Sequence, residues 1–320
     1  PGLGMPAAPA VGCERALSAA HLQPPVVVEP TGEHHFSVIL LHGFSNRGTD
    51  FLPLMRSFAR LGIDVSRVRF IFPNAPRRTM HWPGSDWSRR GFAAWYTYYT
   101  DLSGQSSADA DEIAVCELEA SAAALRALAA AEAAALGGDY SRVFVGGYSQ
   151  GGTVAAHAAV TEGAPRLAGV LLSRSVLMAQ TIPSLTAAEG SPTPFFAFRS
   201  GRDNVYPIDV QCRSQERLVA GGWTLAALEC SDLNHAPWSW TEYDYAAACA
   251  AFALGLSGNA PPTGVVAGGG GTCSDLKGML LSLCRYRFPY QLALAFPCCR
   301  GDDQAPATDR KGTSKLDTKS

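Results

Sequence analysis

Residues 143–152 read V-F-V-G-G-Y-S-Q-G-G, and this stretch decides the fold. A short apolar run ends in two glycines, and Ser149 stands between these and two further glycines. Residues 147–151 match G-x-S-x-G, and a helix-forming segment follows. A strand, a tight turn that exposes a serine, and a helix form a nucleophile elbow, in which the crowded positions two before and two after the serine favour glycine. An ordinary glycine-rich turn is the alternative interpretation.

The surrounding sequence alternates short apolar runs with helix-forming segments. The runs, each expected to be a buried strand, cover residues 36–41, 68–72, 142–145, 168–172, 194–198 and 223–228. Helices are expected from about 111 to 136, after 151, from 208 to 220 and from 243 to 254. Buried strands separated by helices predict a three-layer α/β domain over residues 25–256, with a mostly parallel sheet and helices on both faces.

The two ends of the chain differ from this domain in composition. Residues 1–24 are rich in Ala, Pro and Gly and are expected to be a flexible leader. Residues 257–320 begin as a Gly/Pro-rich linker and continue as a tail of low order. The formal net charge of −2 gives no reason to expect a nucleic-acid partner, and no apolar run is long enough for a membrane span.

The nine cysteines form neither a C-x-x-C pair nor a zinc spacing. An odd number of scattered cysteines in a long chain indicates free thiols in a reducing compartment, so we predict a cytoplasmic protein. The sequence begins with Pro1 rather than Met, which leaves room for a preceding targeting signal.

A serine nucleophile needs a base, usually a histidine, and a carboxylate that holds the base. The chain order on this fold is serine, acid, histidine. His157 lies two turns along the helix that Ser149 begins and points away from it, so His235, just past a predicted strand, is the expected base. Asp203, which also follows a strand, is the expected acid, and Asp232 is the alternative, more typical of a turn or cap.

The reaction also needs N–H groups that stabilise an oxyanion. One is expected from the backbone of Gln150, which follows the nucleophile. The second is expected from Phe44, because residues 40–44 (L-L-H-G-F) turn after an earlier strand. His42 precedes the serine at the end of that strand, and a structural role is expected for it.

Together these residues resemble the acyl-protein thioesterase / phospholipase-carboxylesterase family of α/β-hydrolases. The likeness covers about residues 36–255. It rests on L-L-H-G-F at 40–44, F-P-N-A-P at 72–76, A-W-Y at 94–96, G-G-Y-S-Q-G-G at 146–152, G-R-D-N-V-Y-P at 201–207 and N-H at 234–235. The resemblance implies a triad of Ser149, Asp203 and His235, an oxyanion hole of the Phe44 and Gln150 amides, and no metal or organic cofactor. It also implies hydrolysis of esters or thioesters, with S-palmitoylated proteins or lysophospholipids as substrates.

The sequence departs from the family pattern at three places. Ser45-Asn46 replaces the usual Gly-Asp, Thr97 replaces the Asp of a Trp-Phe-Asp element, and Arg174 replaces a small residue. We expect these changes to flank the cleft and to affect the acyl-chain preference rather than hydrolysis itself.

Two further segments bear on the substrate. An aromatic segment at residues 82–99 is interpreted as the wall or lid of an acyl slot, or else as core packing; its Trp82, Trp87 and Trp95, with Trp238 after the histidine, are the expected substrate-binding residues. Cys298-Cys299 follows an apolar stretch, where an S-acylated segment in transient membrane contact is the alternative to an unstructured extension.

We therefore predict a serine hydrolase that cleaves ester or thioester bonds of acylated small molecules, lipids or proteins. A short-chain carboxylesterase is the alternative within the same chemistry. A catalytically silent fold that binds a lipid or a protein is a further alternative, disfavoured because nucleophile, base and acid are all present.

Overall fold

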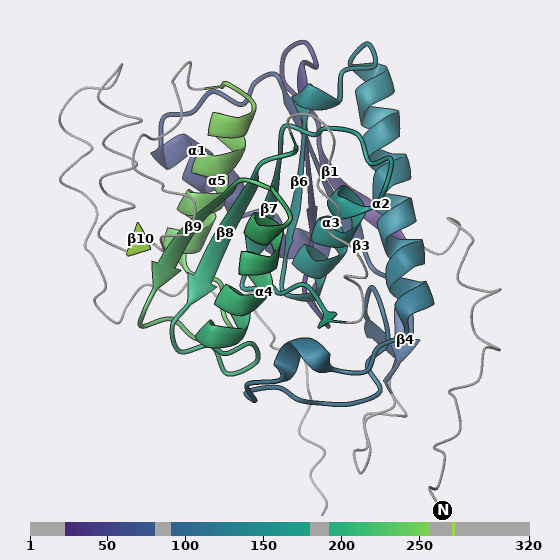
Figure 1. Cartoon of the computed structure of the whole chain (residues 1–320). Coiled ribbons are helices and arrows are strands. Elements are labelled where there is room, and N and C mark those ends of the chain that lie inside the picture. Colours follow the sequence, from purple (N-terminus) through teal and green to yellow (C-terminus); the bar gives the residue numbers. More distant parts are fainter. Residues whose placement is uncertain (1–22, 81–90, 180–191, 257–270, 273–320) are drawn as a thin grey trace, which may run out of the picture.

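The computed structural model describes residues 23–80, 91–179, 192–256 and 271–272 (Figure 1). Its helices are α1 (Leu54–Arg60), α2 (Val115–Ala135), α3 (Gln150–Val160), α4 (Ile208–Ala220) and α5 (Trp240–Ala253), with short 3-10 turns η3 (Gly48–Phe51), η5 (Ala108–Ala110) and η6 (Tyr140–Arg142). Its strands are β1 (Gln23–Val28), β2 (Phe36–Leu41), β3 (Val68–Asn74), β4 (Arg77–Thr79), β5 (Gly91–Ala93), β6 (Val143–Tyr148), β7 (Gly169–Ser173), β8 (Phe195–Ser200), β9 (Leu225–Cys230) and β10 (Gly271–Thr272).

The described strands form one large sheet and one small hairpin. The order in the large sheet is β1-β3-β2-β6-β7-β8-β9-β10, and all its neighbours are parallel except the antiparallel pair β1 and β3. The hairpin is the antiparallel pair β4 and β5. Because the parallel strands run the same way, their carboxyl ends gather at one edge of the sheet, at the bottom of Figure 1.

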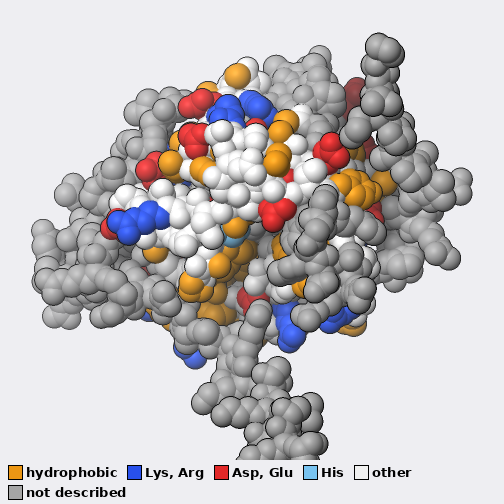
Figure 2. Space-filling view, turned by 90° about the horizontal axis from the view of Figure 1, so that it is seen from below, with side chains coloured by type: hydrophobic (Ala, Val, Ile, Leu, Met, Phe, Trp, Pro, Cys, Tyr) orange, Lys and Arg blue, Asp and Glu red, His pale blue; other side chains and the backbone are white. Residues whose placement is uncertain are grey.

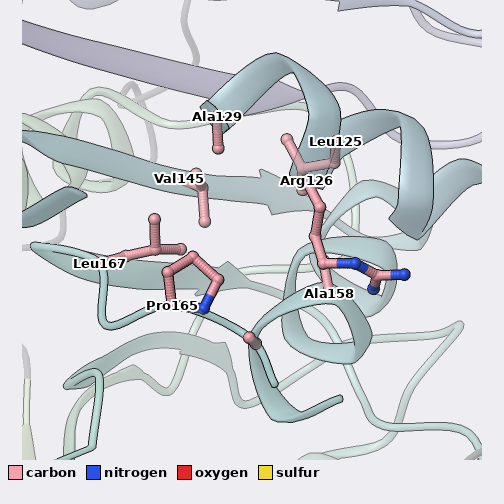
Figure 3. A pocket seen from close by; sticks show the side chains of 8 residues that line it. Leu125, Arg126, Ala129, Val145, Ala158, Pro165 and Leu167 are labelled. Carbon is pink, nitrogen blue, oxygen red and sulfur yellow. The ribbon is translucent and has the colours of Figure 1, made fainter. Parts of the chain in front are cut away.

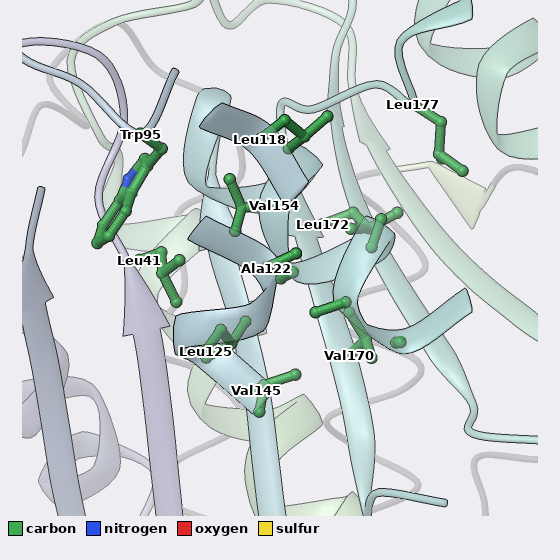
Figure 4. Packing of buried hydrophobic residues seen from close by; sticks show 14 of the residues in the cluster. Leu41, Trp95, Leu118, Ala122, Leu125, Val145, Val154, Val170, Leu172 and Leu177 are labelled. Carbon is green, nitrogen blue, oxygen red and sulfur yellow. The ribbon is translucent and has the colours of Figure 1, made fainter. Parts of the chain in front are cut away.

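Helices cover both faces of the sheet and create two hydrophobic clusters. Alternate residues of one strand enter different clusters: Ile39 packs on the side of α2, α3 and α4, and Val38 on the side of α1 and α5. Figure 4 shows the first cluster, where Leu118, Ala122 and Leu125 of α2 meet the sheet and α3. The three-layer arrangement with a mostly parallel sheet is confirmed.

The predicted strands and helices all occur, with shifted ends. The strand before Ser149 extends to Tyr148, and the long helix begins at Val115 rather than near residue 111. The prediction missed α1, the hairpin β4–β5 and the edge strand β1, which begins at Gln23, inside the predicted leader. The remainder of the leader, and of the linker and tail apart from residues 271–272, lies outside the described residues.

One part of the cysteine prediction is wrong. Cys116, Cys212 and Cys249 are free, but Cys230 is disulfide-bonded. The sequence could not show this, because a disulfide depends on which residues the completed fold brings together. Among the described helices, none is long and apolar enough to cross a membrane.

Candidate active site

The residues predicted to react follow three strands of the parallel sheet. Ser149 follows β6, Asp203 lies three residues after β8, and His235 lies five residues after β9. Their loops therefore leave the sheet at its carboxyl edge. Figure 2 looks onto this edge from below, and a histidine side chain is visible there inside a hollow bordered by hydrophobic side chains.

The turn at Ser149 is strained, as an elbow requires. Its φ is 51° and its ψ is −122°, a combination that L-residues rarely adopt. The N–H of Ser149 donates to the Ser173 carbonyl of β7 at 2.8 Å, and the Ser175 hydroxyl donates to the Ser149 carbonyl at 2.8 Å. Because both its N–H and its C=O are held, the strained backbone is fixed from the neighbouring strand.

The flanking glycines are required by close approach. A Cβ on Gly147 would lie 2.4 Å from the carbonyl carbon of Gly151, and a Cβ on Gly151 would lie 2.1 Å from the Leu41 oxygen. Neither glycine has a positive φ. The strand, the helix and the end of β2 therefore meet at distances that only glycine allows.

Ser149, His235 and Asp203 lie in one hydrogen-bonded chain. His235 Nε2 is 2.9 Å from Ser149 Oγ, and His235 Nδ1 is 2.9 Å from each carboxylate oxygen of Asp203. Only 6–8% of the surface of each residue is exposed. With Nδ1 donating to the carboxylate, Nε2 of the neutral ring is left to accept the serine proton.

The Asp203 carboxylate is held on both oxygens. The backbone N–H groups of Val205 and Tyr206 donate to Oδ1 at 2.9 and 2.8 Å, and Gln211 Nε2 donates to Oδ2 at 3.3 Å. Asp232, the alternative acid, has an exposed side chain 3.5 Å from Arg202. The structure therefore places Asp203, and not Asp232, against the histidine.

His42 anchors the loop that carries Phe44. Its Nε2 accepts the Ala75 N–H at 3.0 Å, so Nδ1 carries the proton and donates to the Gly43 carbonyl at 2.7 Å. The Asn46 N–H also donates to that carbonyl, at 3.1 Å. Burial lowers the pKa of His42, which favours this neutral form. Because the carbonyl of a trans peptide points away from the N–H of the next residue, these bonds also orient the Phe44 N–H.

Trp95 joins this loop to the elbow. Its indole N–H donates to the His42 carbonyl at 2.7 Å, and its backbone N–H donates to the side-chain oxygen of Gln150 at 2.8 Å. Gln150 Nε2 donates in turn to the Tyr96 carbonyl at 2.8 Å. The Gln150 N–H is at the first residue of α3, where N–H groups have no acceptor within the helix.

The four tryptophans predicted to contact substrate have different outcomes. Trp95 is 1% exposed and lies in the core (Figure 4), so its indole has no surface for a substrate. Trp238 is also buried, with its ring stacked on Tyr243 at 4.6 Å. For Trp95 the packing alternative holds, because the loop turns its ring inward. Trp238 is 9% exposed, no less than the three residues of the proposed relay, so its contact with substrate stays a prediction. Trp82 and Trp87 lie outside the described residues.

We expected Arg174 to flank the cleft, because it departs from the family pattern. The structure instead places its side chain in the interior. Its side chain has no exposed surface and forms an ion pair with Glu242 at 2.8 Å. Its guanidinium also donates to the carbonyls of Asn234 and Pro237, on either side of His235. Sequence reasoning missed this contact, and the only signal was the arginine at a position where the resemblance to the family leads one to expect a small residue.

A small apolar cavity lies away from these residues, between α2, α3 and the segment before β7 (Figure 3). It is lined by Leu125, Arg126, Ala129, Val145, Ala158, Ala164, Pro165 and Leu167. Its volume of about 10 Å³ is at the lower limit for one water molecule. It is a packing gap of the core. Within the described part of the chain, no three His, Cys, Asp or Glu side chains come together as a metal site.

A strained serine between a strand and a helix, beside a histidine and an aspartate at the carboxyl edge of a parallel sheet, defines an α/β-hydrolase. The chain belongs to the phospholipase/carboxylesterase family, whose sequence pattern matches residues 22–239. It is a hydrolase of carboxylic ester or thioester bonds, as the resemblance implied.

Individual relatives agree with this assignment. Acyl-protein thioesterase 1 of Schizosaccharomyces pombe is 28% identical over 195 residues, which are 61% of this chain and 80% of that protein. Acyl-protein thioesterase 1 of Emericella nidulans is 28% identical over 205 residues, 60% of this chain and 79% of that protein. The structure of Zea mays acyl-protein thioesterase 2 superposes with a TM-score of 0.56 at 22% identity, over 72% of this chain and 99% of that one. That structural likeness establishes the fold alone.

Proposed function

We propose that Ser149, His235 and Asp203 hydrolyse long-chain acyl thioesters and esters through an acyl-enzyme. The observation that supports this most directly is the chain of 2.9 Å contacts from Ser149 Oγ through His235 to Asp203. A serine hydroxyl becomes a nucleophile when an imidazole takes its proton, and the buried carboxylate stabilises the imidazolium that results.

In the first half-reaction Ser149 Oγ attacks the acyl carbonyl carbon and its proton moves to His235 Nε2. The carbonyl oxygen becomes an oxyanion, which the N–H groups of Phe44 and Gln150 stabilise together with the positive end of α3. The bond to the leaving alcohol or thiol breaks, and His235 returns the proton to the leaving group. A water molecule then repeats the sequence on the acyl-enzyme and releases the acid.

The long acyl chain is proposed from aromatic side chains beside the oxyanion loop. The half-buried ring of Phe44 contacts Phe92 at 5.3 Å and Tyr98 at 6.3 Å between ring centroids. Such a cluster offers apolar surface to an acyl group next to the reacting serine. Acylated proteins are the proposed physiological substrates, as the names of the fungal relatives indicate for those proteins.

The nucleophile is tested by labelling with a fluorophosphonate. Wild type should be labelled and should hydrolyse p-nitrophenyl acyl esters, and Ser149→Ala should lose both activities. Ser141→Ala, which changes a serine at the opposite end of β6, is the matched control and should keep both. Labelling of Ser149→Ala at the wild-type rate would refute the assignment.

The acyl preference needs a second assay. Matched oxygen esters and thioesters of acetyl, octanoyl and palmitoyl groups should show kcat/KM rising with chain length. A maximum at acetyl would instead support the short-chain carboxylesterase.

The cytoplasmic location stays a prediction, and so does transient membrane contact through Cys298-Cys299, which lies outside the described residues. The disulfide at Cys230 removes one premise of the first prediction, since disulfides persist mainly in oxidising compartments. Fractionation of the cells that express the protein, with detection by antibody, tests both.

A further inference from the structure

The loop that carries His235 is held through its backbone by a buried arginine. Arg174 follows β7 with a φ of 46°, and its side chain is fully buried. One guanidinium nitrogen, Nη1, donates to the Asn234 carbonyl and, at 3.1 Å, to the Pro237 carbonyl. These carbonyls lie just before and two residues after His235, so a single planar group spans the histidine position.

A third carbonyl of the same loop is also held. The Tyr148 hydroxyl donates to the carbonyl of His235 itself. Tyr148 immediately precedes the nucleophile, and Arg174 follows Ser173, whose carbonyl accepts the Ser149 N–H. The segments that hold the loop of the base are therefore the ones that hold the nucleophile.

Glu242 neutralises the arginine. Its Oε2 lies 2.8 Å from Arg174 Nη2, its Oε1 accepts a hydrogen bond from Ser173, and its side chain has no exposed surface. Burial raises the pKa of Glu242, whereas the guanidinium and the hydrogen bonds from Ser173 and Ser239 lower it. Glu242 is also in the first turn of α5, where its N–H donates to the Ser239 hydroxyl at 3.1 Å.

Stability alone does not account for this pair. Burial of two charges is expensive, and an apolar pair of similar volume is often at least as stable. Within the described residues, Arg174 Nε also makes no hydrogen bond, which adds to the cost. A buried pair retained at this cost, with its guanidinium on the loop of the base, points to a role at the site.

We infer that Arg174 and Glu242 are positioning residues of the proposed relay: the guanidinium fixes the loop of His235, and the carboxylate cancels its charge so that the imidazolium can form. This inference rests on the proposed function of Ser149 and His235. Neither residue touches the reacting atoms, and both act through the histidine.

The charges around His235 determine how the carboxylate contributes. The titratable and charged groups that face the histidine or its loop are Asp203 after β8, Tyr148 on β6, Tyr206 before α4, Arg174 after β7, Glu242 on α5 and the exposed Asp232–Arg202 pair of the adjoining loops. Asp203 and Glu242 favour the imidazolium and Arg174 opposes it. Without Glu242, Asp203 would be the remaining carboxylate in this group that offsets the buried guanidinium.

The double variant Arg174→Met/Glu242→Leu tests the positioning role. It replaces the pair by apolar side chains of similar size and leaves no lone buried charge, so it should fold, with a Tm lowered by the hydrogen bonds that are lost. Because the loop of His235 loses two carbonyl anchors, kcat should fall about ten- to a hundredfold, with KM changed less than about threefold. A folded double variant with the kcat of wild type would overturn the inference.

Glu242→Gln tests the charge balance. It removes the negative charge that pairs with Arg174, so the acid limb of the kcat/KM profile should move to lower pH by about one unit. A shift of about this size is the effect of one charge within a Debye length at an effective dielectric constant near 20. Glu132→Gln is the matched control, because Glu132 is likewise buried, pairs with Arg69 at 2.9 Å and accepts the Ser37 hydroxyl at 2.7 Å, at the other end of the sheet. The control should keep the wild-type limb.

The outcomes separate this inference from the proposed function. An unmoved limb in folded Glu242→Gln rejects the charge balance, and if that variant does not fold, the kcat of the double variant decides alone. NMR titration of the His235 ring in resting enzyme gives the same shift without turnover. A Ser149→Ala variant that still hydrolyses ester would reject the proposed function instead, whatever Glu242 does.

Discussion

Replacement of Trp95 by phenylalanine tests how the oxyanion loop is held. In wild type the indole N–H donates to the His42 carbonyl at 2.7 Å, and both residues are 1% exposed. Phenylalanine cannot donate, so a buried carbonyl loses its partner, which costs about 1–3 kcal/mol. The smaller ring also leaves a cavity of roughly 40 Å³, worth about 1 kcal/mol at about 24 cal/mol per Å³. The free energy of unfolding should fall by about 2–4 kcal/mol in total.

The same change should lower the rate. The His42 carbonyl precedes the peptide that orients the Phe44 N–H, and loss of one oxyanion donor costs about a hundred- to a thousandfold in kcat. Because displacement of the loop weakens this donor rather than removing it, we expect kcat to fall about ten- to a hundredfold with KM nearly unchanged. The assays are urea unfolding and steady-state hydrolysis of a p-nitrophenyl ester.

Trp223→Phe is the matched control. Trp223 is 4% exposed, and its indole N–H bonds to no group of the described residues. It precedes β9, at the sheet edge opposite the site. The control should lose only the cavity contribution of about 1 kcal/mol and keep the wild-type kcat. Equal kcat values for the two variants would refute the reasoning, and a raised KM with normal kcat for Trp95→Phe would restore the substrate contact predicted from sequence.

Two further variants test the packing of the elbow and a buried carboxyl. Gly151→Ala places a Cβ 2.1 Å from the Leu41 oxygen and should cost about 3 kcal/mol in urea unfolding with a large loss of activity. Gly91→Ala is its control and should change neither measurably, because among the described residues the nearest atom to that Cβ, apart from its chain neighbours, is on Arg77 at 3.6 Å. Burial raises the pKa of Asp111 to about 6, above its unfolded value, so ionisation of this group disfavours folding. Wild type should therefore lose about 1–2 kcal/mol as pH rises from about 4 to about 6, with allowance for solvent screening, and the same slope in Asp111→Asn would contradict this origin.

The chemistry at the strand ends was predictable because it depends on local sequence. An apolar run before G-x-S-x-G predicts the elbow, and the order serine, acid, histidine selects Asp203 and His235 from few alternatives. Parallel strands bring the residues that follow them to one edge, so a correct list of strands was enough to bring these side chains together.

The contacts that hold the site in place were not predictable, because they join residues that lie far apart in the sequence. The Arg174 and Glu242 side chains meet across 68 residues of chain (242 − 174), and composition leads one to expect an arginine in solvent. Likewise, the segment around Trp95 has neither a helical nor a strand period, so the sequence did not indicate which way the indole points. Both contacts depend on which loops the completed sheet brings side by side.

Backbone strain shows how far the site depends on that sheet. In the described residues, the non-glycine residues with a positive φ are Ser45, Ser149 and Arg174, and each lies in a loop or turn that leaves a strand at the edge of the site. Each such conformation costs on the order of 1–3 kcal/mol and persists only where its surroundings impose it. Their N–H groups all donate to a neighbouring segment: Ser45 to Ala93, Ser149 to Ser173 and Arg174 to Phe198, each at 2.8 Å. Ser173 lies in β7 and Phe198 lies in β8. The turn at Ser149, after β6, is therefore held by β7, and the turn at Arg174, after β7, is held by β8. The geometry of the nucleophile and of the group that holds the base is thus imposed by strand pairing, which no single stretch of sequence contains.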